Sequence, residues 1–269
     1  MRKSLVMLAG LGLSIGVFAA NQEIDFGVFA SSSMTSYGNG NFTNNGNPMG
    51  EYLGYKDSID KASYVHGLLS YSGYQSNTND ESSTTYPRSG LARNNQLKVS
   101  AIYGYNIQKE LLMPVPTYIE LGVGYGNWNL AAQSENYNYP SQINFNWFYV
   151  PIGLSIVNSV GGTTYTLKGG ALVEVGGLAN YNSFVYFPTS SSTGQNIASN
   201  SVNLDLTFGY YANFETAYQL SSSWILKWDL YYMNTPLQTT GNMQGIDGYT
   251  LGTFNNQNAG VACSLGYQF

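Results

Sequence analysis

Apolar and polar residues alternate along much of the chain. In the segment 203–210, large apolar side chains fill the even-numbered positions, and Asn, Asp, Thr and Gly fill the odd-numbered ones. A period of two residues is typical of a β-strand with one apolar face. The same alternation recurs in further segments, at 94–107, 116–131, 163–179, 223–235 and 257–269. No apolar spacing in the sequence is typical of a helix of normal length, so we expect an all-β protein.

The connections between these segments are of two kinds. Short turns are expected at 158–162 and 219–223, whereas 76–92, 180–200 and 236–255 are long and polar. Barrels that cross a membrane have short turns at one end and long loops at the other. Their sheet must close, because inside lipid no water satisfies an open sheet edge. A soluble β-sandwich is the alternative, but its polar positions would carry more charge than these do.

The number of strands follows from counting back from the C-terminus. The six alternating segments above count as six strands, and the strand that contains 203–210 is expected to run over 202–218. Three further strands are expected at 143–157, 62–75 and 23–36. A weaker strand at 48–56, turned at 57–60, brings the total to ten. Bacterial single-chain barrels have an even number of strands, so nine is disfavoured. We predict a closed antiparallel up-and-down transmembrane β-barrel of ten strands, with eight strands after an N-terminal segment as the alternative.

The N-terminus has the pattern of an export signal. Arg2 and Lys3 precede an apolar stretch from Leu5 to Phe18, and two small residues end it. This is the order of a secretory signal peptide, which predicts cleavage after Ala19. The apolar stretch is shorter than the roughly 20 residues of a spanning helix. We therefore expect a signal peptide at 1–19 and a barrel at 20–269.

Composition narrows the function. Only 9% of the residues are charged, against about 25% in soluble domains. The net charge is −5, so no basic surface for nucleic acid is expected. Cys263 is the only cysteine, which excludes an intramolecular disulfide, and His66 is the only histidine, which makes a transition-metal site a poor fit. We predict no cofactor, no metal and no catalytic residue.

In the expected strands, the charged residues lie mostly at alternate positions, on the face opposite to the aromatic residues. A lysine or arginine facing lipid at mid-depth would cost roughly 2–4 kcal/mol. We therefore expect these side chains to face inward and to pair across the lumen. The predicted network consists of Lys98, Glu120, Lys168, Glu174, Asp205, Glu215, Lys227 and Asp229.

Aromatic residues are expected at the two membrane interfaces, where the ring is apolar and its tip is wet. The candidates are Tyr103, Tyr105, Tyr125, Trp224, Trp228, Tyr231 and Tyr232. Other aromatic residues and asparagines gather in expected loops at 39–47, 136–139 and 181–187. These loops are candidates for contact with a surface ligand, because loops on a rigid scaffold often carry function.

A family resemblance adds to this interpretation. The last nine residues, 261–269, end in Phe269 with Tyr267 two positions earlier. They resemble the C-terminal strand of bacterial outer-membrane proteins, which the barrel-assembly machinery recognises. The segments 149–154 and 168–171 look like those of small opacity-protein and outer membrane protein A-like barrels. The resemblance implies a location in the outer membrane of a Gram-negative-type bacterium, with Tyr267 and Phe269 as the assembly signal.

Three functions remain open from the sequence. The first is a non-enzymatic barrel with a structural or surface-interaction role and a lumen filled by side chains. The second is a narrow, cation-preferring, porin-like pore for small solutes, which the excess of inward acids would favour. The third is a lipid-modifying enzyme that uses His66. The expected partners are outer-membrane lipids, the barrel-assembly machinery and an unidentified surface ligand, and the barrel is expected to be a monomer.

Overall fold

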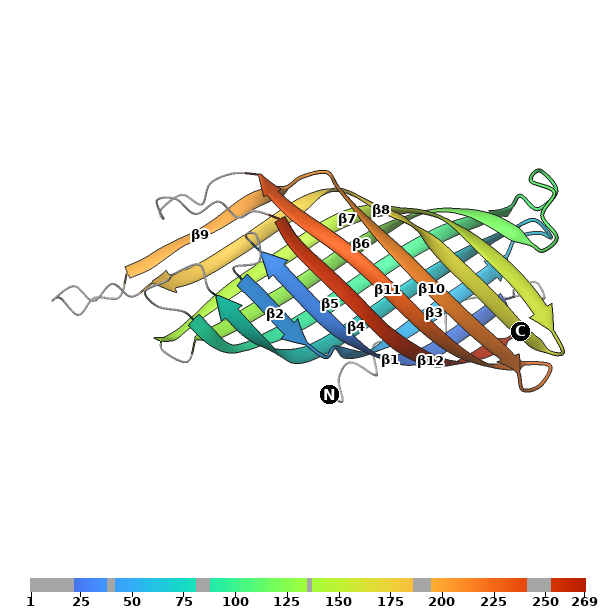
Figure 1. Cartoon of the computed structure of the whole chain (residues 1–269), viewed down its shortest axis with the longest axis horizontal. Coiled ribbons are helices and arrows are strands. Elements are labelled where there is room, and N and C mark those ends of the chain that lie inside the picture. The colour runs from blue at the N-terminus through green and yellow to red at the C-terminus, as the bar shows by residue number, and fades with distance from the viewer. Residues whose placement is uncertain (1–21, 38–41, 81–87, 135–136, 186–194, 241–252) are drawn as a thin grey trace.

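The computed structural model describes residues 22–37, 42–80, 88–134, 137–185, 195–240 and 253–269. The predicted signal peptide at 1–19 lies outside these ranges. Figure 1 shows a long barrel of tilted strands, with the C-terminus at the end where the short turns lie. In the described part of the chain, no helix is long and apolar enough to cross a membrane.

Twelve strand segments form one antiparallel sheet, and β12 pairs with β1 to close it. Closure leaves the wall without a free edge at membrane depth, as lipid requires. The segments are β1 (Gln22–Tyr37), β2 (Phe42–Gly46), β3 (Met49–Ser58), β4 (Ser63–Asp80), β5 (Arg88–Asn106), β6 (Thr117–Ser134), β7 (Tyr137–Val160), β8 (Thr163–Val185), β9 (Gln195–Leu204), β10 (Thr207–Gln219), β11 (Trp224–Thr240) and β12 (Thr253–Gln268).

At two places around the barrel, two consecutive strand segments share one position between the same two neighbouring strands. β2 and β3 both pair with β1 and β4, and the break between them contains Pro48, which has no N–H to donate to the sheet. β9 and β10 both pair with β8 and β11. The twelve segments therefore occupy ten positions around the barrel. The weak strand predicted at 48–56 is present as β3, and the eight-stranded alternative is wrong.

The strand ends differ from the prediction in the expected long loops. β4 runs to Asp80 and β5 begins at Arg88, so most of the loop predicted at 76–92 is strand. Most of the loop predicted at 180–200 is likewise strand in β8 and β9, and β11 and β12 extend into the ends of the loop predicted at 236–255. The candidate ligand loops at 39–47, 136–139 and 181–187 are also strand in part, at 42–46, 137–139 and 181–185. Asn47 lies in the break between β2 and β3. The other residues of these loops lie outside the described ranges.

The continuous alternation predicted for 202–218 is wrong, because the parity changes at Asp205. Leu204 is 7% exposed and faces inward, whereas Leu206 is 59% exposed and faces outward. At the same level β8 carries a bulge, where the pairing with β7 shifts next to Gly176, whose φ is +136°. Each of the two adjacent strands thus holds one extra residue, which moves the next side chains to the opposite face.

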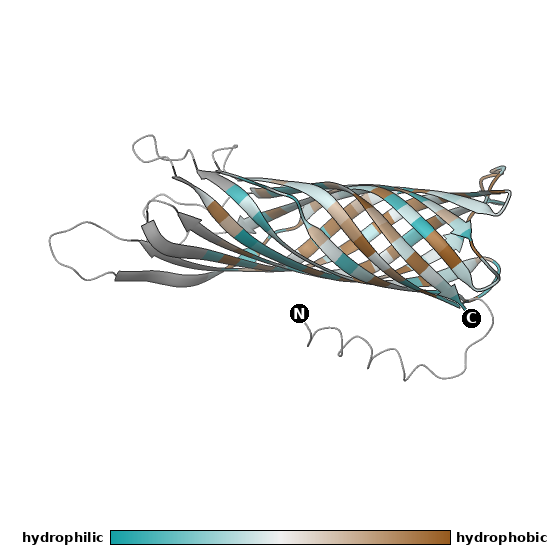
Figure 2. Cartoon of the chain, turned by 90° about the horizontal axis from the view of Figure 1, so that it is seen from below, coloured by the Kyte–Doolittle hydropathy of each residue, from teal (hydrophilic) through white to brown (hydrophobic). Residues whose placement is uncertain are grey.

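The outer surface next to the short turns is apolar. Exposed residues there include Val28, Val99, Leu121, Leu167 and Leu230, and Figure 2 shows such positions alternating with hydrophilic ones along the strands. Tyr103, Tyr105, Trp224 and Trp228 are also exposed on this surface, as an interface role requires. The assignment of Tyr231 to the membrane interface is wrong, because it lines the interior and its ring contacts Phe29.

At the short-turn end, the described connections are 59–62, 107–116, 161–162 and 220–223. β7 and β8 are joined by only Gly161 and Gly162, with φ values of +59° and +84°. Two positive φ angles in a two-residue hairpin suit the twist of the flanking strands and favour glycine. The turn predicted at 158–162 is therefore present, and the flanking strands reach further into it than expected.

Candidate functional site

Inward-facing glycines make room for large side chains inside the barrel. A Cβ added at Gly126 would lie 2.2 Å from the ring of Trp147, and one at Gly124 would lie 2.2 Å from the ring of Tyr149. Gly104 has the same relation to Tyr64. Each ring lies flat against the bare backbone of the neighbouring strand. The lumen is therefore narrowed by aromatic rings rather than left open.

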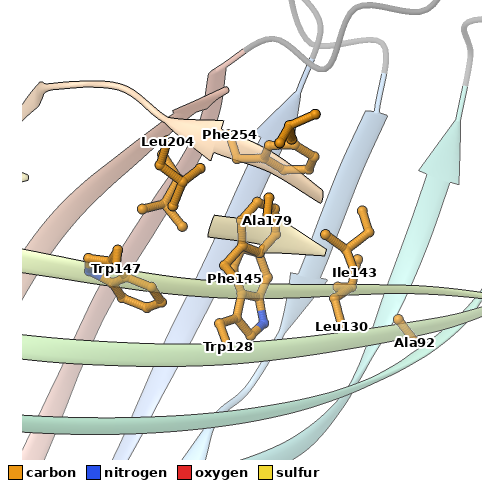
Figure 3. Packing of buried hydrophobic residues seen from close by; sticks show 11 residues of the cluster. Ala92, Trp128, Leu130, Ile143, Phe145, Trp147, Ala179, Leu204 and Phe254 are labelled. Atoms are coloured by element: carbon orange, nitrogen blue, oxygen red, sulfur yellow. The ribbon is translucent and has the colours of Figure 1, made fainter. Parts of the chain in front are cut away.

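An apolar plug fills the lumen in the half of the barrel that is away from the short turns. Trp128 stacks on Phe145, with ring centroids 5.2 Å apart and planes at 21°, and Phe145 meets Phe254 edge-on at 4.8 Å. Figure 3 shows these side chains pointing toward one another from different strands. The plug consists of Ala92, Trp128, Leu130, Ile143, Phe145, Trp147, Ala179, Val202, Leu204, Leu237 and Phe254, all buried.

Polar side chains beside the plug satisfy one another. The indole N–H of Trp128 donates to the Asn94 carbonyl at 3.0 Å. The Asn94 amide donates to the Ser76 hydroxyl at 2.6 Å, and the Asn44 amide donates to Asn94 at 3.2 Å. Buried polar groups are costly unless they are paired in this way. The side chains of Trp128, Asn94, Asn44 and Ser76 are thus paired as in a protein interior.

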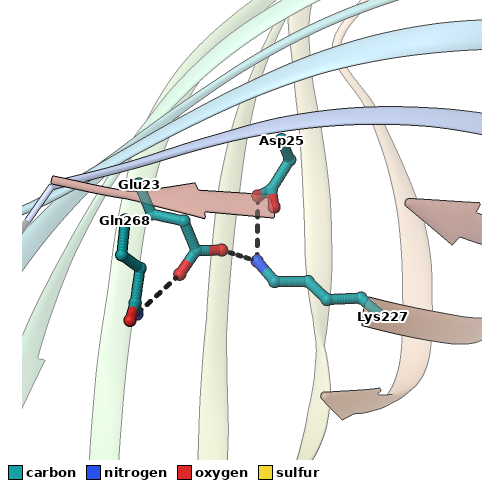
Figure 4. A network of polar contacts seen from close by, with 4 residues as sticks. All are labelled: Glu23, Asp25, Lys227 and Gln268. Carbon is teal, nitrogen blue, oxygen red and sulfur yellow. Dashed lines mark hydrogen bonds and ion pairs between the residues drawn. The ribbon is translucent and has the colours of Figure 1, made fainter. Parts of the chain in front are cut away.

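Near the short-turn end, Lys227 is held by two carboxylates of β1. Its Nζ donates to Asp25 Oδ2 at 2.9 Å and forms an ion pair with Glu23, and Gln268 donates to Glu23 at 3.4 Å. Figure 4 shows the four side chains converging across the closing strands. We call these four residues the Lys227 cluster. They tie β11 and β12 to β1 from inside the lumen.

The predicted pairing of the lumen charges is largely wrong. In the described part of the chain, the only ion pairs are those of Lys227, with Glu23 and Asp25. Lys98 and Lys168 line the lumen, as expected from their parity, but neither has a carboxylate within 4.0 Å. The sequence interpretation missed Glu23 and Asp25, although they alternate with the apolar residues of their strand.

The predicted acids occupy several places. Glu120 is buried and accepts a hydrogen bond from the Tyr64 hydroxyl. Glu174 is buried and accepts one from Thr207 at 2.8 Å. Glu215 and Asp229 line the lumen, where Glu215 lies in electrostatic reach of three lysines: Lys56, Lys168 and Lys227.

Asp205 departs from the expected network. It lies at the break between β9 and β10, where its backbone N–H donates to the Gln238 carbonyl at 2.8 Å. It does not line the lumen cavity. Its place is explained by the change of parity at this residue, which the uniform alternation assumed from the sequence did not include.

A cavity of about 310 Å³ lies between the plug and the Lys227 cluster. His66 lines it, on the parity expected from the sequence. No hydroxyl or carboxylate is hydrogen-bonded to its imidazole among the described residues. Nor do the described residues contain a group of three or more His, Cys, Asp or Glu that could hold a metal ion.

A second cavity of about 260 Å³ lies at the short-turn end, lined by the turn residues Asp60 and Lys61. Lys56 and Tyr64 line both cavities. The Lys56 ammonium lies 4.7 Å from the centroid of the Tyr64 ring, a cation–π contact. These two side chains therefore separate the larger cavity from the short-turn end.

The residues of the expected assembly signal lie on the outer face of the closing strand. The Tyr267 ring meets Trp224 edge-on at 4.9 Å and Phe269 at 5.0 Å. The Phe269 N–H donates to the Gln22 carbonyl at 3.0 Å, and the Phe269 side chain remains exposed. Both rings are thus displayed on the surface and do not contribute to the interior.

No protein-family model matches this sequence, and no curated protein matches it. Among solved structures, the outer membrane protease OmpT of Escherichia coli is similar, with a TM-score of 0.60 and 10% identity over 95% of this chain and 99% of that chain. The translocator domain of the autotransporter NalP of Neisseria meningitidis matches with a TM-score of 0.48 and 10% identity, over 100% and 95% of the two chains. The fold is that of bacterial outer-membrane β-barrels, which supports the location expected from the C-terminal residues.

Proposed function

We propose that the protein is a non-conducting outer-membrane barrel that serves as a rigid support for its long surface strands and loops. The observation that carries this proposal is the apolar plug. Eleven buried apolar residues and the buried polar side chains beside them occupy this part of the lumen, where Trp128 and Phe145 are 0% exposed. An ion crossing this region would have to leave water, which is strongly unfavourable without a polar partner.

The strands that extend beyond the apolar belt support the surface role. Several outward-facing positions there are asparagines, and they bond to one another. Asn127 donates to Asn144 at 3.1 Å and to Asn146 at 2.8 Å, and the Tyr125 hydroxyl donates to Asn146 at 2.8 Å. Such a surface suits water and neutral ligands better than lipid. Outer-membrane lipids, the barrel-assembly machinery and a surface ligand are the partners that we propose for the monomer.

Planar-bilayer conductance tests the proposal. The protein is expected to give no steady current, whereas the double variant Trp128→Ala, Phe145→Ala should conduct, because it removes the two stacked rings at the centre of the plug. Phe148→Ala is the matched control, since Phe148 is 58% exposed on the outer face. Steady current through the unaltered protein would refute the proposal and favour the cation-preferring pore.

An enzymatic role is the weaker candidate. OmpT is named as a protease, but at 10% identity the likeness concerns the fold only. His66 is the histidine on which a lipid-modifying activity would depend, and it lies inside the lumen below the plug. Lipid mass profiles of cells with the unaltered protein and with His66→Ala should be the same. A lipid species that disappears in the variant would instead establish catalysis.

A further inference from the structure

Polar side chains of β4 and β5 line one side of the lumen cavity, in the part nearer the plug. Five residues of β4 and β5 point into the cavity from paired positions, Ser70 opposite Lys98 and Ser72 opposite Gln96, with Ser100 following on β5. We call these five residues the cradle. Each can donate a hydrogen bond, and none is an acid.

Two donors of the cradle lack a strong acceptor. The Lys98 ammonium has only the Met233 sulfur at 3.3 Å as its hydrogen-bond partner, and sulfur is a weak acceptor. Gln96 is only 7% exposed, and its amide nitrogen has no hydrogen-bond partner in good geometry among the described residues, although the Tyr74 hydroxyl interacts with this side chain. Glu174 lies in electrostatic reach of Lys98, but it forms no ion pair with it. A half-buried ammonium and a buried amide without strong acceptors are costly to leave unpaired.

Apolar side chains of β7, β8 and β11 line the cavity beside the polar Asn213, Tyr231 and Asn258. They include Leu172, Met233, Pro151 and the ring of Tyr149, which also packs against the plug. A cavity with an apolar wall and a few convergent polar groups is the usual form of a small-molecule site, and about 310 Å³ is within the range of such sites.

We propose that this cavity binds a small organic acid, with its carboxylate on the cradle and its apolar chain against the apolar side chains of β7, β8 and β11. The cradle itself offers a single ammonium with neutral donors, and the other three lysines of the cavity lie among its four acids, which favours a monocarboxylate over a dianionic phosphate. The ligand accepts the hydrogen bonds that Lys98 and Gln96 lack, which form the charge-assisted type of contact. The proposal is independent of whether the barrel conducts, because the cradle lies below the plug.

Calorimetric titration of the full mature protein in a neutral detergent tests the proposal. Hexanoate is the probe, and hexanamide is its uncharged counterpart. Hexanoate should bind at least about tenfold more tightly than hexanamide, and Lys98→Met should remove that preference, since removing one partner of a buried charge contact is costly. Lys61→Met is the matched control, because it removes a lysine that is exposed in a turn and does not line this cavity. It should leave hexanoate affinity within about twofold.

Glu174→Gln provides a second test that keeps the size of the side chain. Glu174 is the anion that competes for Lys98, so this variant should bind hexanoate several-fold more tightly. The proposal is overturned if the unaltered protein does not prefer hexanoate to hexanamide, or if Lys98→Met retains the preference. If Lys98→Met does not fold, unchanged affinity in Glu174→Gln overturns it.

Discussion

Replacing Lys227 by methionine should destabilise the barrel more than any other single lysine change. The substitution removes an ammonium that has Asp25 at 2.9 Å and Glu23 as a second partner. At an effective dielectric constant of about 20, one such contact has a Coulomb energy of about 6 kcal/mol before desolvation is counted. Breaking a buried ion pair on one side costs about 3–5 kcal/mol. Because a cavity adjoins the cluster, we expect the lower end, about 3 kcal/mol.

The assay is urea unfolding of the barrel in lipid vesicles, followed by tryptophan fluorescence. Lys61→Met is the control, because Lys61 is exposed in a turn and its loss should change the free energy of unfolding by less than about 0.5 kcal/mol. Adding Asp25→Asn to Lys227→Met should restore part of the stability, since it removes one of the two acids left unpaired. If Lys227→Met unfolds at the same urea concentration as Lys61→Met, the cluster does not stabilise the barrel and this reasoning is wrong.

Three further predictions follow from the packing and the topology. Gly126→Ala should lower the free energy of unfolding by about 1–3 kcal/mol, because its Cβ would meet a tryptophan ring at 2.2 Å, whereas Gly67→Ala, with 4.0 Å to the nearest atom, should be tolerated. Deleting Phe269 should lower the yield of folded barrel in the outer membrane, measured by heat-modifiable migration on gels, and a normal yield would contradict the assembly signal. Protease added to intact cells should cut within 180–200 or within 76–92 and spare 158–162, and cutting only at 158–162 would invert the orientation.

The strand positions could be predicted because lipid and lumen select opposite kinds of side chain. This selection ends where the barrel leaves the membrane. In β4, Ser76 is buried and Asn77 is exposed, so both faces are polar and the alternation of hydropathy disappears. The sequence interpretation therefore assigned the segment from Ser76 onward to a loop, although its backbone continues the sheet to Asp80.

The interior was predictable in part. Lys98 and Lys168 face inward because their parity required it, but a parity does not say which charges meet. The partners of Lys227 are Glu23 and Asp25, and Asp25 lies 202 residues away along the chain. The stagger at which β12 closes against β1 and β11 decides this contact, and no local pattern encodes that stagger.

The plug depends on the change of parity in β8 and β9. Beyond the bulge at Gly176, β8 turns Ala179 inward, and beyond Asp205, β9 turns Leu204 inward. Without the extra residue in each strand, the opposite set of side chains would face the lumen, and polar Asn203 would replace Leu204. β6 has no such break, and Trp128 lies on the same inward parity as Glu120. The same inward face thus carries an acid at one level and an apolar ring at another. The extra residues turn the apolar side chains of β8 and β9 inward at the level of Trp128, and these side chains join the plug there.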